Sequence, residues 1–283
     1  MALSLAQEGV TKETLHINSL VMKIFNLSTL SFLPAYFCGS EESLLKWTSF
    51  GRRVIELSLA TQASPELKNE AALWWKPAHK AVNLFARLLG RYGIADEDNE
   101  ATIAAAHKHL FASTFDSRFI DLFCTFVQST VAGTAKPPEA LLSVALRVLA
   151  RSVEFGRVSQ GTLKPRAVEV TTALLFPLLC ATQEELALVE SDPVEYVHQD
   201  LDVSLYSARL SARELLCEMC RAWPDTVLGP SLALAREVLL ASVASVAVSP
   251  AHKYGGYEVV TALCKAASPS VPAAAAHIEE LLK

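Results

Sequence analysis

Residues 138–155, PEALLSVALRVLARSVEF, show most clearly the apolar spacing from which the fold is predicted. The large apolar side chains recur at spacings of four, three and four residues, at Leu142, Leu146, Leu149 and Val153. Arg147, Arg151 and Glu154 lie away from this stripe, and Pro138 suits a first helical turn. Because these spacings follow the period of an α-helix, about 3.6 residues, the stretch predicts a helix with one buried face.

Similar amphipathic segments recur along the whole 283-residue chain, separated by short runs of Gly, Pro, Ser or Asp. The chain is 51% apolar and has only 11 glycines, so little in it favours leaving the helical conformation. The expected helices cover residues 11–26, 41–61, 71–92, 98–113, 117–132, 138–155, 164–180, 204–223, 228–247, 255–268 and 271–283. Gly93 is a plausible left-handed cap at the end of the third of these.

Successive pairs of these helices repeat at an irregular period of about 40 to 45 residues, which is typical of HEAT arrays. We therefore predict an all-α fold: a HEAT-repeat (armadillo-like) right-handed α-solenoid of antiparallel helix pairs. The second-helix signature of HEAT units is approximated by Asp202, Ala208, Arg209, Ala212 and Leu216. A globular helical bundle is the structural alternative.

The overall charge and the uncharged runs exclude several classes of protein. A net charge of −5 gives no general attraction for nucleic acid or for anionic lipid. The longest uncharged runs, 24–40 and 238–252, are shorter than the roughly 18 to 20 residues of a membrane span. The N-terminal residues lack the basic and apolar regions of a secretory signal. We therefore expect an intracellular protein without membrane insertion or direct nucleic-acid binding.

The sequence offers little chemistry for an enzyme. No phosphate-binding glycine loop and no H-E-x-x-H zinc motif is present. The acidic run 96–100 lacks the Gly and Glu that a calcium loop needs, since Ala101 and His107 stand at those positions. His107 and His109 would point apart on a helix, and Cys217 and Cys220 have no second ligand pair. We expect reduced, mostly buried thiols, no metal, no cofactor and no catalytic residues.

The segment 183–203 is strongly acidic and contains no Lys or Arg. Its carboxylates are Glu184, Glu185, Glu190, Asp192, Glu195, Asp200 and Asp202. One interpretation is a solvated connector whose short helical turns are N-capped by Asp192, with Pro193 at the first position. The other is a docking surface for a basic partner, which the negative field would steer.

Trp74 and Trp75 are adjacent on an expected helix. Adjacent side chains on a helix diverge by about 100°, so at most one should point straight into the core while the other covers a seam between repeats. The alternative is that one of them is an exposed aromatic contact for a partner. Packing is the interpretation we favour.

Four motifs, in order, resemble the importin-β superfamily, specifically the importin seven and eight class. The first is the run Trp74-Trp75-Lys76, which continues through Leu84, Ala86-Arg87-Leu88 and Arg91-Tyr92-Gly93. The others are Leu163-Lys164-Pro165, Phe176-Pro177-Leu178, and Asp192-Pro193 with Glu195-Tyr196. Exportin-two-like receptors share the last motif, but the Trp-Trp-Lys helix favours the importins.

This resemblance implies a HEAT-repeat nuclear transport receptor that shuttles between nucleus and cytoplasm. Its implied partners are basic cargo such as ribosomal proteins or histones, phenylalanine-glycine (FG) nucleoporins, and the GTPase Ran. The resemblance also favours a role for the acidic carboxylates in binding cargo or Ran. A general HEAT or armadillo scaffold without a transport role is the alternative function.

Family members are several times longer than this chain, and nothing in it corresponds to their N-terminal Ran-binding repeats. We therefore expect residues 1–283 to form one continuous HEAT array that is an internal segment of a longer receptor. The acidic insertion at 183–203 would interrupt that array between two helices.

Overall fold

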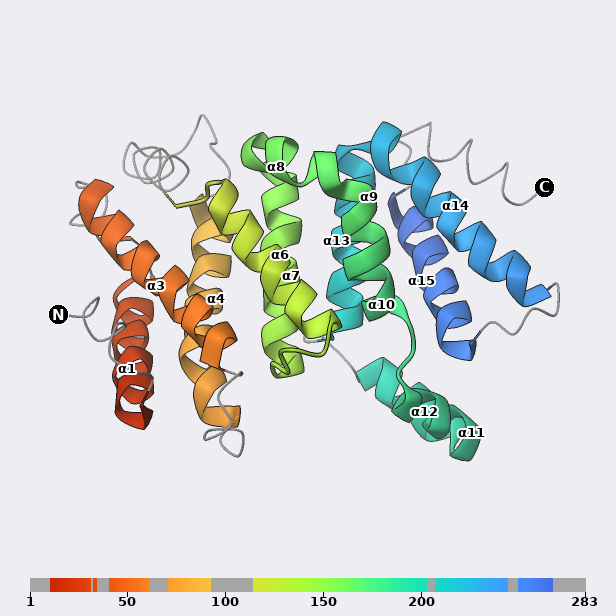
Figure 1. The fold of residues 1–283 in the computed structure, drawn as a ribbon, viewed down its shortest axis with the longest axis horizontal. Helices are drawn as coiled ribbons and strands as arrows, with labels where there is room; N and C mark the ends of the chain where they lie inside the picture. Colours follow the sequence, from red (N-terminus) through yellow and green to blue (C-terminus); the bar gives the residue numbers. More distant parts are fainter. Residues whose placement is uncertain are drawn as a thin grey trace. The chain divides into compact units, whose positions relative to one another are not determined.

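The computed structural model describes residues 11–31, 33–34, 41–61, 71–92, 114–202, 207–243 and 249–266. These residues form helices joined by short connections, and no strand occurs among them (Figure 1). The chain divides into two compact units, residues 1–158 and 159–283. The all-α prediction is confirmed, and successive helices pair side by side within each unit as in a helical solenoid.

The first unit contains five long helices among its described residues. They are α1 (Lys12–Ser28), α3 (Glu41–Thr61), α4 (Ala71–Tyr92), α6 (Ser117–Val131) and α7 (Glu139–Glu154). Helix α4 lies in the middle, because it packs against α1, α3 and α7, while α6 packs against α7. Thr11 caps α1 and Asp116 caps α6, each accepting a backbone hydrogen bond that the first helical turn would otherwise leave unmade.

Helix α7 contains the apolar stripe quoted from residues 138–155, and the four residues of that stripe are buried as predicted. The expectation of a single buried face is wrong, because α7 has neighbours on two sides, α4 and α6. Leu141, Val144 and Val148 are therefore buried as well. Arg151 and Glu154 stay exposed and pair with each other at 2.6 Å.

Trp74 and Trp75 on α4 are both buried, with 3% and 2% of their surfaces exposed. The rings of Trp75 and of Phe126 on α6 form a T-shaped pair with 5.8 Å between ring centres. The packing interpretation is confirmed. The expectation that only one of the two could reach the core is wrong, because α4 is covered on several sides and has more than one inward face.

The second unit is built from short helical pieces followed by three long helices. Its elements are α8 (Arg157–Thr162, which begins two residues before the unit), η2 (Lys164–Arg166), α9 (Ala167–Glu169), η3 (Val170–Leu175), α10 (Phe176–Leu179), α11 (Gln183–Ser191), α12 (Pro193–Asp202), α13 (Ala208–Ala222), α14 (Pro224–Val243) and α15 (Pro250–Ala266). Helix α15 packs against α10, α13 and α14. The contact between α10 and α15 joins an early helix of the second unit to the last helix described in that unit.

The helical run 164–179 widens into a π-helix at η3, just before Pro177. Pro177 has no N–H to donate and its ring crowds the preceding turn, which accounts for the local widening. Among the described residues, only the stretch 164–191 is long and apolar enough to cross a membrane by length and composition. The backbone is extended at Cys180, so this stretch is interrupted and a new helix begins at Gln183. The absence of a membrane-spanning helix stays a prediction.

Gly255 on α15 allows the close contact with α10. A methyl group there would lie 2.8 Å from Cys180 Sγ and 3.1 Å from the Phe176 ring. We expect Gly255→Ala to lower the free energy of unfolding by about 1–3 kcal/mol, measured by urea denaturation. Gly229→Ala on α14 is the matched control, because no atom lies within 4 Å of the added methyl and removing a helical glycine should stabilise slightly. Equal stabilities for the two variants would contradict the tight contact.

Candidate functional site

The acidic segment folds into two helices, α11 and α12, which pack against each other and are named here the acidic helix pair (residues 183–202). A reciprocal cap starts α11. The Thr182 N–H donates to Glu185 Oε2 at 2.6 Å, and the Glu185 N–H donates to Thr182 Oγ1 at 3.2 Å. The segment is therefore more regular than the connector with short helical turns that the sequence suggested.

Asp192 forms the junction between the two helices. Its N–H donates to the Leu188 carbonyl at 2.7 Å and so ends α11. Its Oδ1 accepts from the Glu195 N–H at 3.0 Å and so caps α12, in which Pro193 is the first residue. The capping role predicted for Asp192 and Pro193 is confirmed.

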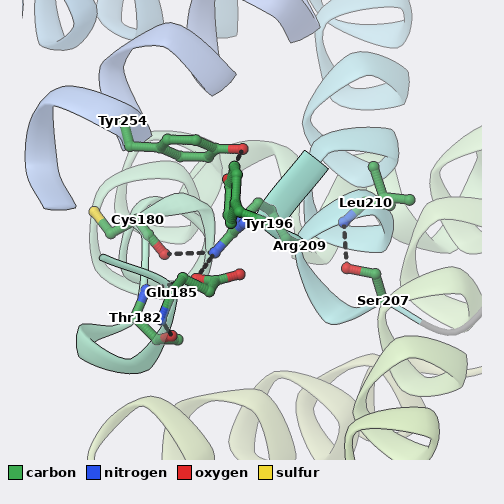
Figure 2. Close-up of polar contacts among 8 residues, drawn as sticks. All are labelled: Cys180, Thr182, Glu185, Tyr196, Ser207, Arg209, Leu210 and Tyr254. Carbon is green, nitrogen blue, oxygen red and sulfur yellow. Dashed lines mark hydrogen bonds and ion pairs between the residues drawn. The ribbon is translucent and has the colours of Figure 1, made fainter. Parts of the chain in front are cut away.

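Arg209, near the start of α13, anchors the acidic helix pair to the rest of the unit (Figure 2). Its guanidinium forms an ion pair with the Glu185 carboxylate and donates to the Cys180 carbonyl at 3.3 Å. It also lies 4.8 Å from the centre of the Tyr254 ring, within cation–π range. One side chain therefore joins α11, the end of α10 and α15.

Two tyrosines make a second connection at the same place. The Tyr196 hydroxyl on α12 lies 3.2 Å from the Tyr254 hydroxyl on α15, and Figure 2 shows the two rings on either side of this contact. Together, Glu185, Tyr196, Arg209 and Tyr254 are named here the Arg209 clamp. The clamp matters for the order of the acidic helix pair because α11 buries none of its own residues.

Within the clamp the pKa values of Glu185, Arg209 and Tyr254 are shifted, and the shifts of Glu185 and Arg209 favour a fixed ion pair. Burial alone would raise the pKa of Glu185, but hydrogen bonds from Arg209 and from the Thr182 amide outweigh it, so the pKa is lowered. Burial alone would lower the pKa of Arg209, but the hydrogen bond to Glu185 outweighs burial, so the pKa of Arg209 is raised. Burial, followed by the bond to Tyr196, raises the pKa of Tyr254. At neutral pH the clamp therefore contains an ion pair beside the neutral phenol of Tyr254.

The seven carboxylates of the segment divide by their surroundings. Glu185 and Asp192 serve the fold, as the clamp and the cap. Glu184, Glu190 and Glu195 are exposed. Asp200 and Asp202 belong to α12, but their side chains lie outside the described residues. On the same two helices Val189, Val194 and Val197 are also exposed, so the surface of the acidic helix pair combines negative charge with apolar area.

A groove of about 410 Å³ runs along α13 and is a weaker candidate for a binding site. Its charged lining residues are Arg213, Glu214, Glu218, Arg221 and Lys265. The charges of both signs are mixed, and Arg221 already pairs with Glu218 at 2.6 Å. The groove therefore presents no single sign of charge to a ligand.

Most of the described cysteines are buried, as expected for structural thiols. Cys217 and Cys220 are free and buried on α13, as expected for an i and i+3 stripe. Burial raises the pKa of Cys220 to about 12, so it is a thiol at neutral pH. Cys124 is also buried, Cys180 is partly covered and Cys264 is exposed.

No group of three metal-ligating side chains gathers within the described part of the chain. The acidic run 96–100, His107, His109 and the Gly93 cap lie outside the described residues. The expected absence of a metal, a cofactor and catalytic residues stays a prediction.

Comparisons with known proteins extend the structural description. No family model matches the sequence, and no solved structure matches the fold. An importin beta-like SAD2 homolog of Arabidopsis thaliana is 22% identical over 183 residues, covering 62% of this chain and 17% of that protein. Importin-8 of Danio rerio is 24% identical over 159 residues, covering 53% and 14%. Human importin-8 is 22% identical over 227 residues, covering 70% and 20%.

The helices define an all-α protein of the helical-repeat class. The similarity to several importins confirms the resemblance to the importin-β superfamily that the four motifs predicted. The chain spans a fifth or less of the length of these three relatives. Of the signature residues, Trp74 and Trp75 are core, Pro177 follows the π-helix, and Pro193 and Tyr196 serve the acidic helix pair.

Proposed function

We propose that this chain is a segment of a nuclear import receptor that binds basic cargo proteins, such as ribosomal proteins or histones. In this proposal it also binds FG nucleoporins and RanGTP, shuttles between nucleus and cytoplasm, and is not an enzyme. The chain would form one continuous HEAT array inside a longer receptor. The similarity to importins supports the class of function, and the acidic helix pair is the observation that supports a basic partner.

The acidic helix pair has the properties of a surface that attracts cations. Glu184, Glu190 and Glu195 are exposed, and no Lys or Arg lies between residues 183 and 202. The Arg209 clamp holds the backbone that carries these carboxylates, so their arrangement is set before a partner arrives. A basic protein would gain complementary potential and a faster association rate from this surface.

Neutralising exposed carboxylates of the pair should weaken cargo binding. We expect Glu184→Gln with Glu190→Gln to reduce the affinity for a purified core histone several-fold at low salt, because opposite charges attract across the contact. The affinity should be measured by fluorescence anisotropy at two salt concentrations, and the difference between variant and parent should shrink at the higher one.

The matched control removes the same charge elsewhere in the unit, by Asp225→Asn with Glu237→Gln on the exposed surface of α14. This control should bind almost as the parent does. Equal losses in the two double variants would mean that net charge, and not the acidic helix pair, determines binding.

Binding to nucleoporins separates a transport receptor from a general scaffold. The chain should be retained on immobilised FG repeats and not on repeats in which serine replaces phenylalanine. Such repeats would insert phenylalanine side chains into apolar grooves between helices. Failure of retention would favour the scaffold, even if the chain still bound the histone.

A further inference from the structure

Helix α4 has one polar face, on which every charged side chain is basic. The charged residues of this helix are Lys76, Lys80, Arg87 and Arg91, and the helix contains no Asp or Glu. Together with Asn83 they follow each other at intervals of four, three, four and four residues, so they lie along one side of the helix. A chain whose net charge is −5 therefore carries a local row of positive charge.

The polar face of α4 stays open although the helix has neighbours on several sides. Helix α4 lies between α1 and α7 in the first unit, and α3 packs on it as well (Figure 1). Lys76, Asn83 and Arg91 are exposed beside these neighbours. In a stacked array each repeat contacts only its neighbours, so a helix placed before α1 would pack on α1 and not on α4.

Helix α1 adds another cation to this face. Ser19, Lys23 and Asn26 share one side of α1, because they are four and three residues apart. Lys80 Nζ donates to Ser19 Oγ at 2.6 Å, and Arg87 donates to Asn26 Oδ1 at 3.0 Å, so this side of α1 lies along α4. Lys23 is exposed between the two contacts. The basic face is defined here as Lys23, Lys76, Lys80, Arg87 and Arg91.

Within the part of the chain that the structure describes, no carboxylate pairs with the basic face. Lys80, Arg87 and Arg91 donate to neutral hydroxyl, amide and carbonyl oxygens of α1 and of the residues that follow it. These bonds hold the side chains without neutralising them. Burial, and after it the charges of Lys23 and Lys76, lower the pKa of Lys80. The cations therefore repel one another, and an anion on the face would relieve that repulsion.

We propose that the basic face binds an acidic polypeptide segment of a partner protein. The charge of such a segment complements the face, and its carboxylates accept the charged hydrogen bonds that lysine and arginine donate. From Lys76 to Arg91 the helix rises about 22 Å, at about 1.5 Å per residue. An extended peptide of about seven residues spans that length. A short segment rich in Asp and Glu therefore matches the basic face in both length and charge.

Nucleic acid, the other common polyanion, fits the basic face less well. The aromatic residues of α4 are Trp74, Trp75, Phe85 and Tyr92, and all are buried, so bases would find no ring of this helix to stack on. A duplex carries one charge per about 1.7 Å along its whole axis, and the rest of this acidic chain would repel it. A short acidic segment can contact the basic face alone.

The inference goes beyond the proposed function and does not rest on it. That function assigns basic partners to the acidic helix pair, which belongs to the other unit. The two surfaces use different residues and are tested with different probes. Binding of the histone and binding of an acidic peptide can therefore fail independently.

An acidic peptide tests the basic face directly. The probe is a fluorescent peptide of about eight glutamates, titrated with the full chain at low salt and followed by anisotropy. We expect binding in the micromolar range that weakens as salt rises, because salt screens the charges. Lys23→Gln with Lys76→Gln should raise the dissociation constant at least about fivefold. Both lysines are exposed and make no hydrogen bond within the described residues, so the helical circular dichroism should not change.

The matched control is Lys164→Gln with Lys253→Gln, which removes the same charge from exposed positions in the other unit. It should bind the peptide as the parent does. Equal losses in the two double variants would overturn the proposal, because net charge would then govern binding. Absence of binding at low salt would overturn it too. A short DNA duplex that bound more tightly than the peptide, and that lost affinity through Lys23→Gln with Lys76→Gln, would assign the basic face to nucleic acid instead.

Crosslinking locates the bound peptide. A carbodiimide takes up the water released when a peptide carboxylate and a lysine amine join as an amide, so it links carboxylates to the lysines they contact. Mass spectrometry should place the crosslinks on Lys23, Lys76 and Lys80. Crosslinks mainly on Lys164 or Lys253 would overturn the proposal, because the peptide would then lie on the other unit.

Discussion

Arg209→Ala is expected to detach the acidic helix pair from its unit while α13 and α15 stay folded. The variant removes the ion pair to Glu185, the hydrogen bond to the Cys180 carbonyl and the contact with the Tyr254 ring. It also leaves the partly buried Glu185 carboxylate without its cation, a loss of about 2 kcal/mol for a charged hydrogen bond of this kind. Hydrogen exchange should show amides 183–202 exchanging at least about tenfold faster.

Two controls separate the clamp from a loss of charge. Arg236→Ala removes an exposed arginine of α14 and should leave the exchange of 183–202 unchanged. Arg209→Lys keeps the charge but not the planar donor fork, so it should fall between the parent and the alanine variant. If Arg209→Ala left the protection of 183–202 intact, the clamp would not be what orders the acidic helix pair.

The same ion pair predicts how acid affects the acidic helix pair. The pKa of Glu185 is lowered in the folded chain, so its contribution is present above the unfolded value, about 4.3, and is lost as the pH falls through the lowered folded value. Protection of 183–202 in the parent should decline over that acidic range. The Arg209→Ala variant should show a smaller step, because only the hydrogen bonds with Thr182 would then favour the Glu185 carboxylate.

Most of the helices could be predicted from apolar spacing alone, and the errors have local causes. The ranges predicted for α3 and α4 coincide with the structure, at 41–61 and 71–92. Helix α14 begins at Pro224 and not at 228, because Pro224 occupies its first position while Pro230 lies inside it. Helix α8 has only six residues, too few for a periodic apolar pattern, and was not predicted.

Burial and the acidic site were harder to predict, because both depend on residues far apart in the sequence. The stripe of α7 indicated one buried face, but α4 covers a second face and starts more than 60 residues earlier. The charge of the acidic segment was evident, whereas its order depends on Arg209 and Tyr254, on two other helices. Arg209 had been noted only as a HEAT signature residue, and no local signal linked it to Glu185.

Trp75→Ala is expected to be the most damaging single change in the first unit. Trp75 is 2% exposed on α4, and its ring contacts Phe126 of α6. Removing the indole would open a cavity in a helix that neighbours cover on several sides, and such changes cost about 3–5 kcal/mol. Urea denaturation followed by far-UV circular dichroism should give a correspondingly lower midpoint for this unit, with α4 and α6 losing hydrogen-exchange protection.

Trp75→Phe distinguishes packing from a polar role for the indole. The Trp75 Nε1 atom is buried and has no hydrogen-bond partner among the described residues, so phenylalanine should lose area but no bond. We expect it to retain at least half of the stability that alanine loses. Tyr257→Ala, which removes an exposed ring from α15, should cost less than about 0.5 kcal/mol. A phenylalanine variant as unstable as the alanine variant would mean that the indole N–H, and not the buried ring area, is what the first unit requires.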